Sequence, residues 1–156
     1  MITTLPEIPD HPFRGYIFDC DGTLVDSMPL HYIAWVEALR LNDAPFNFTE
    51  EVFYKHAGVR EQDVVTILNA EYESRVDPDR VADMKAEIFS QRIPEVQAIA
   101  PVIDLVRQMH GQFPLAVASG SEEHIVRGCL TATGLLDLFE TIVTPAYVAR
   151  GKPAPD

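Results

Sequence analysis

The run YIFDCDGTL, residues 16–24, is the most informative part of the sequence for the fold. A short apolar run, YIF, stops abruptly at Asp19, and a second acid, Asp21, follows two residues later with a glycine behind it. An apolar run without alternation is typical of a strand that is buried on both faces of a parallel sheet. The stretch therefore predicts a buried strand that ends in two carboxylates and a tight turn.

Two further apolar runs repeat this pattern. LAVA, residues 115–118, ends in Ser119-Gly120-Ser121, and TIV, residues 141–143, ends close to Pro145. One helical pattern separates these two runs, as a β-α-β unit of parallel strands requires. In a doubly wound α/β sheet, ligands bind outside the carboxyl ends of the strands. The sequence thus predicts an α/β fold with its polar strand ends along one edge.

Nearly a hundred residues separate the first apolar run from the second, whereas a simple crossover needs only about a dozen. This segment holds several helical patterns, the first with Ser27 as its predicted N-cap and the fourth beginning at Asp77-Pro78. We expect an α/β core domain formed by residues 1–28 and 99–156 and an inserted helical cap domain at residues 29–98. The inward positions predicted on those two helices are Tyr32, Trp35, Val36 and Leu39, then Val81, Met84 and Ile88.

The composition narrows the classes of partner. The 156 residues are 47% hydrophobic and carry a formal net charge of −12, so the chain can bury a core and presents an acidic surface. Such a surface argues against nucleic acid and anionic membranes as main partners. The two cysteines, Cys20 and Cys129, give no disulfide framework, and the N-terminus lacks the layout of a secretory signal. We expect a soluble, reduced, cytoplasmic protein.

The residues at the three predicted strand ends differ in chemistry. Asp19 and Asp21 would repel each other unless a hard cation such as Mg²⁺ lies between them, although two acids in a turn can also be simple turn residues. The run Ser119-Gly120-Ser121 would form an anion cradle at the start of a helix, although Ser121 by itself favours an ordinary N-cap. Lys152, after the third strand, would on its own be a solvated charge. Together the three sites place carboxylates, an anion cradle and a cation at one sheet edge, which indicates a functional site.

These residues match a family pattern. The run FDCDGTL, residues 18–24, resembles the first motif of the haloacid dehalogenase-like (HAD) superfamily, VASG at residues 117–120 resembles the second, and GKPAPD at residues 151–156 the third. The helical insertion resembles the cap of the β-phosphoglucomutase-like subgroup. The likeness is strongest to sugar-phosphate phosphatases of the fructose-1-phosphate phosphatase type.

The resemblance implies a role for each strand-end residue. Asp19 would be the nucleophile that forms an aspartyl-phosphate, and Asp21 the general acid and base. Both would bind Mg²⁺, Asp19 through its carboxylate and Asp21 through its main-chain carbonyl. Ser119, Gly120 and Lys152 would bind the phosphoryl oxygens. The substrate would be a small phosphorylated sugar.

Two cap residues are candidates for contacts with the substrate. His31 lies one helical turn beyond Ser27 and could face the cleft, or could be a histidine on a helix surface. Arg60, in the run Gly58-Val59-Arg60, resembles a residue of the substrate loop of the cap, or is a surface arginine. The mutases carry a lysine immediately before this glycine. This chain has Ala57 at that position, which makes the mutase interpretation less favoured. Cys20 and Trp35 are predicted to be packing residues.

Other functions share parts of this pattern, and the sequence departs from the family pattern in one motif. A β-phosphoglucomutase-like phosphotransferase, a receiver-like phosphoacceptor and a non-catalytic binding module share parts of the pattern. The fourth motif of the family, an acidic strand end that completes the metal site, is absent from these 156 residues. We therefore expect a chain that ends after the third motif, binds Mg²⁺ weakly and turns over slowly. The sequence does not specify the sugar or the oligomeric state.

Overall fold

The computed structural model describes residues 12–152 together with residues 154 and 155. Its sheet contains the strands β1 (Tyr16–Phe18), β2 (Leu115–Ala118) and β3 (Thr141–Val143), in the order β1-β2-β3. Both pairs are parallel, with Phe18 opposite Val117 and Ala118 opposite Val143. All three predicted strands and the parallel α/β class are confirmed.

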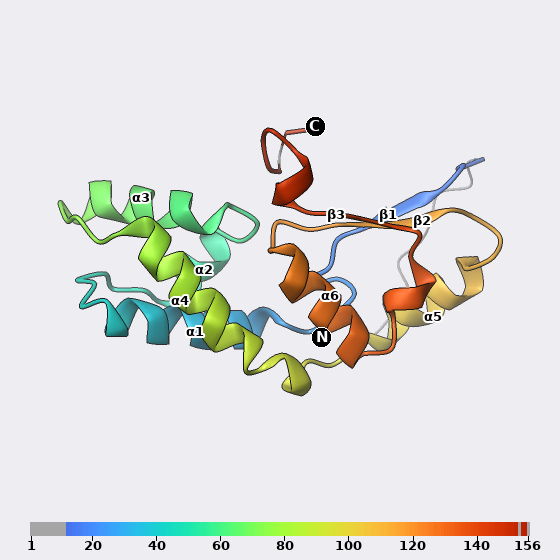
Figure 1. Ribbon diagram of the computed structural model, residues 1–156, viewed down its shortest axis with the longest axis horizontal. Helices are drawn as coiled ribbons and strands as arrows, with labels where there is room; N and C mark the ends of the chain where they lie inside the picture. Colours follow the sequence, from blue (N-terminus) through green and yellow to red (C-terminus); the bar gives the residue numbers. More distant parts are fainter. Residues whose placement is uncertain (1–11, 153, 156) are drawn as a thin grey trace.

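Helices α5 (Ala100–Met109) and α6 (Glu123–Ala132) lie on the same side of this sheet (Figure 1). Leu115 and Val117 are buried there with the apolar faces of both helices. The prediction that the first strand is buried on both faces is wrong for the described sheet. Ile17 is 76% exposed, because β1 is an edge strand and its middle side chain points away from the helices.

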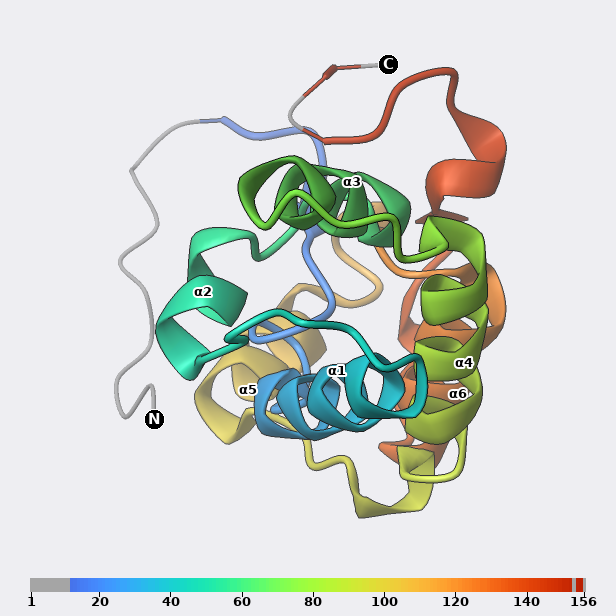
Figure 2. The same cartoon turned by 90° about the vertical axis from the view of Figure 1, so that its left-hand side faces the viewer.

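The inserted segment folds into α1 (Met28–Leu41), α2 (Glu50–Lys55), α3 (Glu61–Glu71) and α4 (Pro78–Ser90). These helices gather beside the sheet unit in Figure 1 and stand in front of α5 and α6 in Figure 2. They enclose an apolar cluster separate from that of the sheet, with Trp35, Phe53, Val65 and Leu68 among its buried members. This arrangement agrees with an inserted cap, and the boundaries at residues 28 and 98 stay a prediction.

Two antiparallel segments connect the cap to the sheet unit. Val25 and Ala98 form an isolated antiparallel bridge, the N–H of Asp26 donates to the Gln97 carbonyl at 2.8 Å, and the N–H of Ile99 donates to the Leu24 carbonyl at 2.9 Å. Because both connections run through this short hydrogen-bonded pair, a movement of the cap would bend the chain there. Three single-turn helices, η1 (Ile93–Glu95), η2 (Leu136–Leu138) and η3 (Pro145–Tyr147), complete the described elements.

Three details of the predicted helices are wrong. Val36 is 41% exposed, because the buried face of α1 runs through His31, Ala34 and Trp35. Ser27 is the N-cap residue of α1, as predicted, but its side chain makes no capping hydrogen bond, since its backbone is already in the α region. The N-cap of α6 is Glu122 and not Ser121. None of the helices in the described residues combines the length and the apolar character that a membrane span requires.

Candidate active site

The strand ends and the cap enclose a cavity of about 210 Å³. Its sheet side consists of the residues that follow the three strands: Asp19, Asp21, Ser119, Gly120, Ser121 and Lys152. The cap contributes an apolar and aromatic wall that includes Trp35, Phe48 and Phe53, together with the polar side chains of His31, Glu61 and Lys85. The cavity is therefore polar at the strand ends and largely apolar on the cap side.

Asp19 follows β1 directly, and its side chain is 47% exposed. Its Oδ1 accepts a hydrogen bond from the Cys20 N–H at 3.0 Å and another from Lys152 Nζ at 2.8 Å. Lys152 also donates to the Ala118 carbonyl at the end of β2, at 2.6 Å. The fold thus joins a carboxylate and a lysine that lie 133 positions apart. Of the third motif, Pro153 and Asp156 lie outside the described residues.

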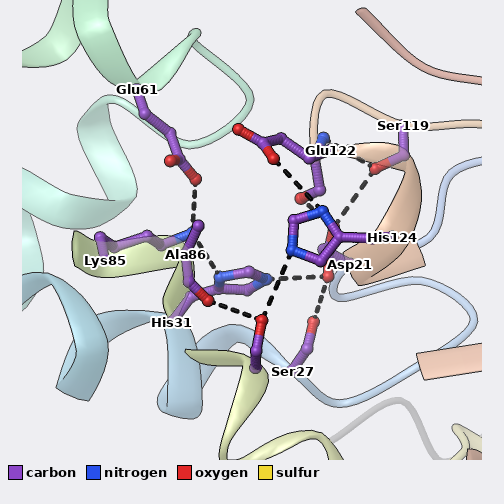
Figure 3. Close-up of polar contacts among 11 residues, drawn as sticks. Asp21, Ser27, His31, Glu61, Lys85, Ala86, Ser119, Glu122 and His124 are labelled. Atoms are coloured by element: carbon purple, nitrogen blue, oxygen red, sulfur yellow. Dashed lines mark hydrogen bonds and ion pairs between the residues drawn. The ribbon is translucent and has the colours of Figure 1, made fainter. Parts of the chain in front are cut away.

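Asp21 is surrounded by hydrogen-bond donors (Figure 3). Its Oδ1 accepts from Ser27 Oγ at 2.6 Å and from His31 Nε2 at 3.0 Å, and its Oδ2 accepts from Ser121 Oγ at 2.8 Å and from Ser119 Oγ at 3.3 Å. Burial alone would raise the pKa of Asp21, but the interaction with His31 and the Ser27 and Ser121 hydroxyls outweigh it and lower the pKa well below the usual range. Asp21 is therefore ionised in this arrangement.

His31 connects Asp21 to a buried ion pair. Its ring stacks on Phe89 with 3.8 Å between centroids, and its Nδ1 lies 2.9 Å from Lys85 Nζ. Because an ammonium group only donates, Nδ1 accepts and the ring proton is assigned to Nε2, facing Asp21. Burial and then the charge of Lys85 lower the pKa of His31, so the ring is neutral near pH 7. Lys85 in turn pairs with Glu61, and Figure 3 shows the chain of contacts from Glu61 to Asp21.

The loop after β2 presents a main-chain donor to the cavity. The Ser119 N–H donates to the Val143 carbonyl at 3.0 Å, and the Ser121 N–H to Ser119 Oγ at 3.0 Å. The Gly120 N–H has no acceptor among the described residues. A Cβ at Gly120 would lie 3.4 Å from the Gly58 carbonyl oxygen, an ordinary van der Waals contact, so the cap loop lies directly against Gly120. Gly120 can thus receive an anion beneath that loop.

Arg60 lies in a neighbouring cavity of about 660 Å³, and the lining of the first cavity, within the described residues, does not include it. Glu61 and Gly120 line both cavities, so the two are neighbours along one wall. The structure thus brings together the predicted Asp19, Asp21, Ser119, Gly120, Lys152 and His31, and leaves Arg60 at the adjoining space.

Three residues of this network, Ser27, Glu61 and Lys85, are not predicted from the sequence as site residues, whereas Ser121 belongs to the predicted anion cradle. Ser27 and Ser121 each precede a helical pattern, and a serine at that position favours a helix cap as much as a residue of the site. Lys85 is only 4% exposed, on the buried face of α4 between Val81 and Phe89. A lysine within that apolar spacing is the signal that could have indicated a buried cation and its counter-ion.

The predicted packing roles of two other residues are confirmed. Cys20 is fully buried, and burial and then the nearby Asp21 raise the pKa of its thiol. Trp35 is 5% exposed and packs in the cap, where it also lines the cavity. Cys20 therefore has the environment of an inert packing residue and not of a nucleophile.

Comparison with known proteins identifies the family. Residues 16–156 match the family described as haloacid dehalogenase-like hydrolase. This chain belongs to that family. The fructose-1-phosphate phosphatase YqaB of Escherichia coli (strain K12) is 31% identical over 145 residues, which cover 92% of this chain and 76% of YqaB. The confirmed fold and motifs thus belong to a HAD-like hydrolase.

Two further relatives carry different names. The β-phosphoglucomutase of Bacillus subtilis (strain 168) is 27% identical over 157 residues, covering 92% of this chain and 66% of the mutase. The crystal structure of CbbY from Rhodobacter sphaeroides in complex with phosphate superposes with a TM-score of 0.78 at 21% identity, covering 92% of this chain and 68% of CbbY. The predicted HAD superfamily membership and the predicted class, a hydrolase of phosphate monoesters, are confirmed.

Proposed function

We propose that this HAD-like hydrolase is a Mg²⁺-dependent phosphatase of small sugar phosphates that works through an aspartyl-phosphate. The observation that carries the proposal is the environment of Asp19. Its carboxylate follows β1, is half exposed in the cavity, and lies 2.8 Å from the Lys152 ammonium. An accessible carboxylate beside a cation is suited to attack an anionic phosphate, and the neighbouring Gly120 N–H, which has no acceptor among the described residues, can bind a phosphoryl oxygen.

In the first step Asp19 attacks phosphorus, and the bond to the sugar oxygen breaks. Lys152, the Gly120 N–H and the Ser119 hydroxyl bind the phosphoryl oxygens and stabilise the charge that develops on them. Lys152 already contacts Asp19, so it also holds the nucleophile in place. The products are an acyl phosphate on Asp19, the aspartyl-phosphate, and a sugar alkoxide that needs a proton.

Asp21 supplies this proton and later takes one from the water that hydrolyses the aspartyl-phosphate. In the structure, His31 and the hydroxyls of Ser27 and Ser121 hold Asp21 ionised, and Ser119 Oγ donates to it at 3.3 Å. The Ser119 hydroxyl has one proton and cannot donate to both Asp21 and a phosphate oxygen. Phosphate binding therefore removes one hydrogen bond from Asp21 and brings a like charge close to it, and both changes favour its protonated form. Acid–base assistance of this kind contributes about 10²–10⁴-fold to the rate.

The oxygen donors at this site suit Mg²⁺. Asp19 Oδ2 and the Asp21 main-chain carbonyl accept no hydrogen bond from the described residues, and both are hard ligands. No set of three or more His, Cys, Asp or Glu side chains converges on a metal position in the described part of the chain. Mg²⁺ commonly binds through one or two carboxylates together with waters and substrate phosphate. Bound there, it would neutralise the charge between carboxylate and phosphate.

The relatives support a phosphorylated sugar as substrate, since one is named a fructose-1-phosphate phosphatase and another a β-phosphoglucomutase. The mutase alternative is disfavoured because Ala57 replaces the lysine of the mutases at the cap loop. A phosphatase needs no bisphosphate activator, whereas a mutase does. The proposed location stays the one that the sequence predicts, the cytoplasm.

The test is phosphate release from a panel of sugar monophosphates, with Mg²⁺ and with excess EDTA. We expect release that requires Mg²⁺ and no bisphosphate, and near-complete loss in Asp19→Asn. Asp26→Asn, a neighbouring acid outside the cavity lining, is the matched control and should retain activity. Full activity of Asp19→Asn would contradict the assignment of the nucleophile. Release that depends on a sugar bisphosphate would favour the mutase.

A further inference from the structure

Lys85 is a buried charged residue of the cap and therefore needs polar partners. The side chain is buried in α4, beneath the cavity and against Phe89, whose ring centroid lies 5.5 Å from Nζ. A buried ammonium is costly unless it is paired and hydrogen-bonded. Among the described residues it has two polar partners, His31 Nδ1 at 2.9 Å and Glu61 Oε1 at 2.5 Å. Glu61 is thus the counter-ion that offsets the cost of burying the Lys85 ammonium.

Lys85 in turn determines how His31 meets Asp21. The ring plane is set by the parallel stack on Phe89, at an interplanar angle of 3°. The ring could still present either nitrogen as its donor. With the ammonium at Nδ1, only Nε2 can carry the proton, and it is directed to Asp21 Oδ1 at 3.0 Å. The donor to Asp21 therefore depends on the ion pair on the other side of the ring.

Glu61 sits where the cap loop meets the sheet unit. It is the first residue of α3, directly after the loop that contains Gly58, and the Gly58 carbonyl faces Gly120 in the loop after β2. The Glu61 side chain is 21% exposed and lines both cavities. Placing this loop against Gly120 therefore also brings the Glu61 carboxylate over Lys85.

We propose that Glu61 is a positioning residue for Asp21: it holds Lys85 against His31, so that His31 presents its Nε2 proton to the Asp21 carboxylate. The proposal rests on the proposed function, in which Asp21 is the acid and base. Glu61 does not contact the reacting atoms. Without it, the flexible lysine side chain is drawn towards water, and Nδ1 of His31 loses its donor.

Glu61→Gln tests this role, with Glu71→Gln as the matched control at the exposed end of the same helix. We expect kcat on the preferred sugar phosphate to fall about tenfold or more, a part of the acid–base contribution. We expect KM to stay within about threefold, because the phosphate-binding groups are unchanged. Glu61→Asp, which retains the charge on a shorter side chain, should recover part of kcat.

The spectroscopic readout needs no activity. In ¹⁵N-histidine-labelled protein, the ring nitrogens of His31 should report the Nε2–H tautomer in the wild type and in Glu71→Gln. Both shifts should change in Glu61→Gln and in Lys85→Met. Lys85→Met removes the buried charge, so it serves as the second variant if Glu61→Gln does not fold.

Wild-type kcat together with wild-type His31 shifts in Glu61→Gln, or in Lys85→Met, would overturn the proposal. A loss of kcat without a change in the His31 shifts would also overturn it, since Glu61 would then act by another route. If the wild type releases no phosphate from any sugar phosphate, the proposed function fails. The expected change in the His31 shifts would in that case still support the positioning role.

Discussion

The Lys85–Glu61 pair predicts an asymmetric response of stability to mutation. The Lys85 side chain is 5% exposed and that of Glu61 is 21% exposed, so water can reach the carboxylate much better than the ammonium. Removing one partner of a buried pair typically costs about 3–5 kcal/mol, because the other charge is left buried and unpaired. We therefore expect Glu61→Gln to lower the free energy of unfolding by about 3–5 kcal/mol.

Lys85→Met should behave differently, because the partner left behind is the accessible one. Replacing a buried charge with an apolar side chain of similar volume is often neutral or stabilising. His31 Nδ1 then loses its donor, and an unsatisfied buried acceptor costs about 1–3 kcal/mol. These contributions oppose each other, and we expect Lys85→Met to be clearly less destabilising than Glu61→Gln.

Urea unfolding followed by far-UV circular dichroism measures both variants, with Glu71→Gln as the control for loss of an exposed glutamate. At about 2–4 °C per kcal/mol for a domain of this size, Glu61→Gln should lower Tm by roughly 6–20 °C. A cost below about 1 kcal/mol, the range of a surface ion pair, would refute the reasoning. So would a larger cost for Lys85→Met than for Glu61→Gln.

Three further predictions concern other parts of the molecule. Ser27→Ala should lower the free energy of unfolding by about 1.5–3 kcal/mol, since the buried Ser27 hydroxyl donates to a charged carboxylate at 2.6 Å; a cost near zero in urea unfolding would contradict the donor network around that carboxylate. Gly58→Ala should cost about 1–2 kcal/mol because φ is +82°, with no atom within 4 Å of the added Cβ; Gly58→Asn should cost less, and equal costs would exclude backbone strain as the cause. Burial raises the pKa of Cys129 from 9.0 to about 12, so this thiol stays protonated in the folded protein while it ionises in the unfolded chain. The free energy of unfolding should therefore fall as pH rises from about 9 towards 12, and less so in Cys129→Ala; identical pH profiles for the two proteins would count against this assignment.

The strand-end chemistry could be predicted because it is local in sequence. The apolar run before Asp19 and the polar loops after the next two strands place each group at a carboxyl strand end, and parallel pairing brings these ends together. The position of Lys152 beside Asp19 follows from the same topology. The insertion of a helical cap was likewise evident from the length of the first crossover.

The sequence alone could not reveal how Asp21 is held. Its two oxygens accept from Ser27 and His31 at one end of α1 and from Ser119 and Ser121 after β2, a hundred positions away. In the sequence, a serine before a helical pattern has the same appearance whether it caps the helix or turns its hydroxyl elsewhere. Ser27 departs from the cap role because its own backbone is in the α region.

The strands, the cap insertion and the residues at the strand ends could be predicted from the sequence, since each depends on neighbours only a few positions away. The buried cation at Lys85 was decided by tertiary structure alone. Its partners lie 54 and 24 positions away, and the face of α4 that is buried depends on how α1 and α3 pack against it. The helical periodicity predicts which side chains share a face. Only packing against other helices determines which face is buried, and a charged side chain on the buried face then needs a counter-ion.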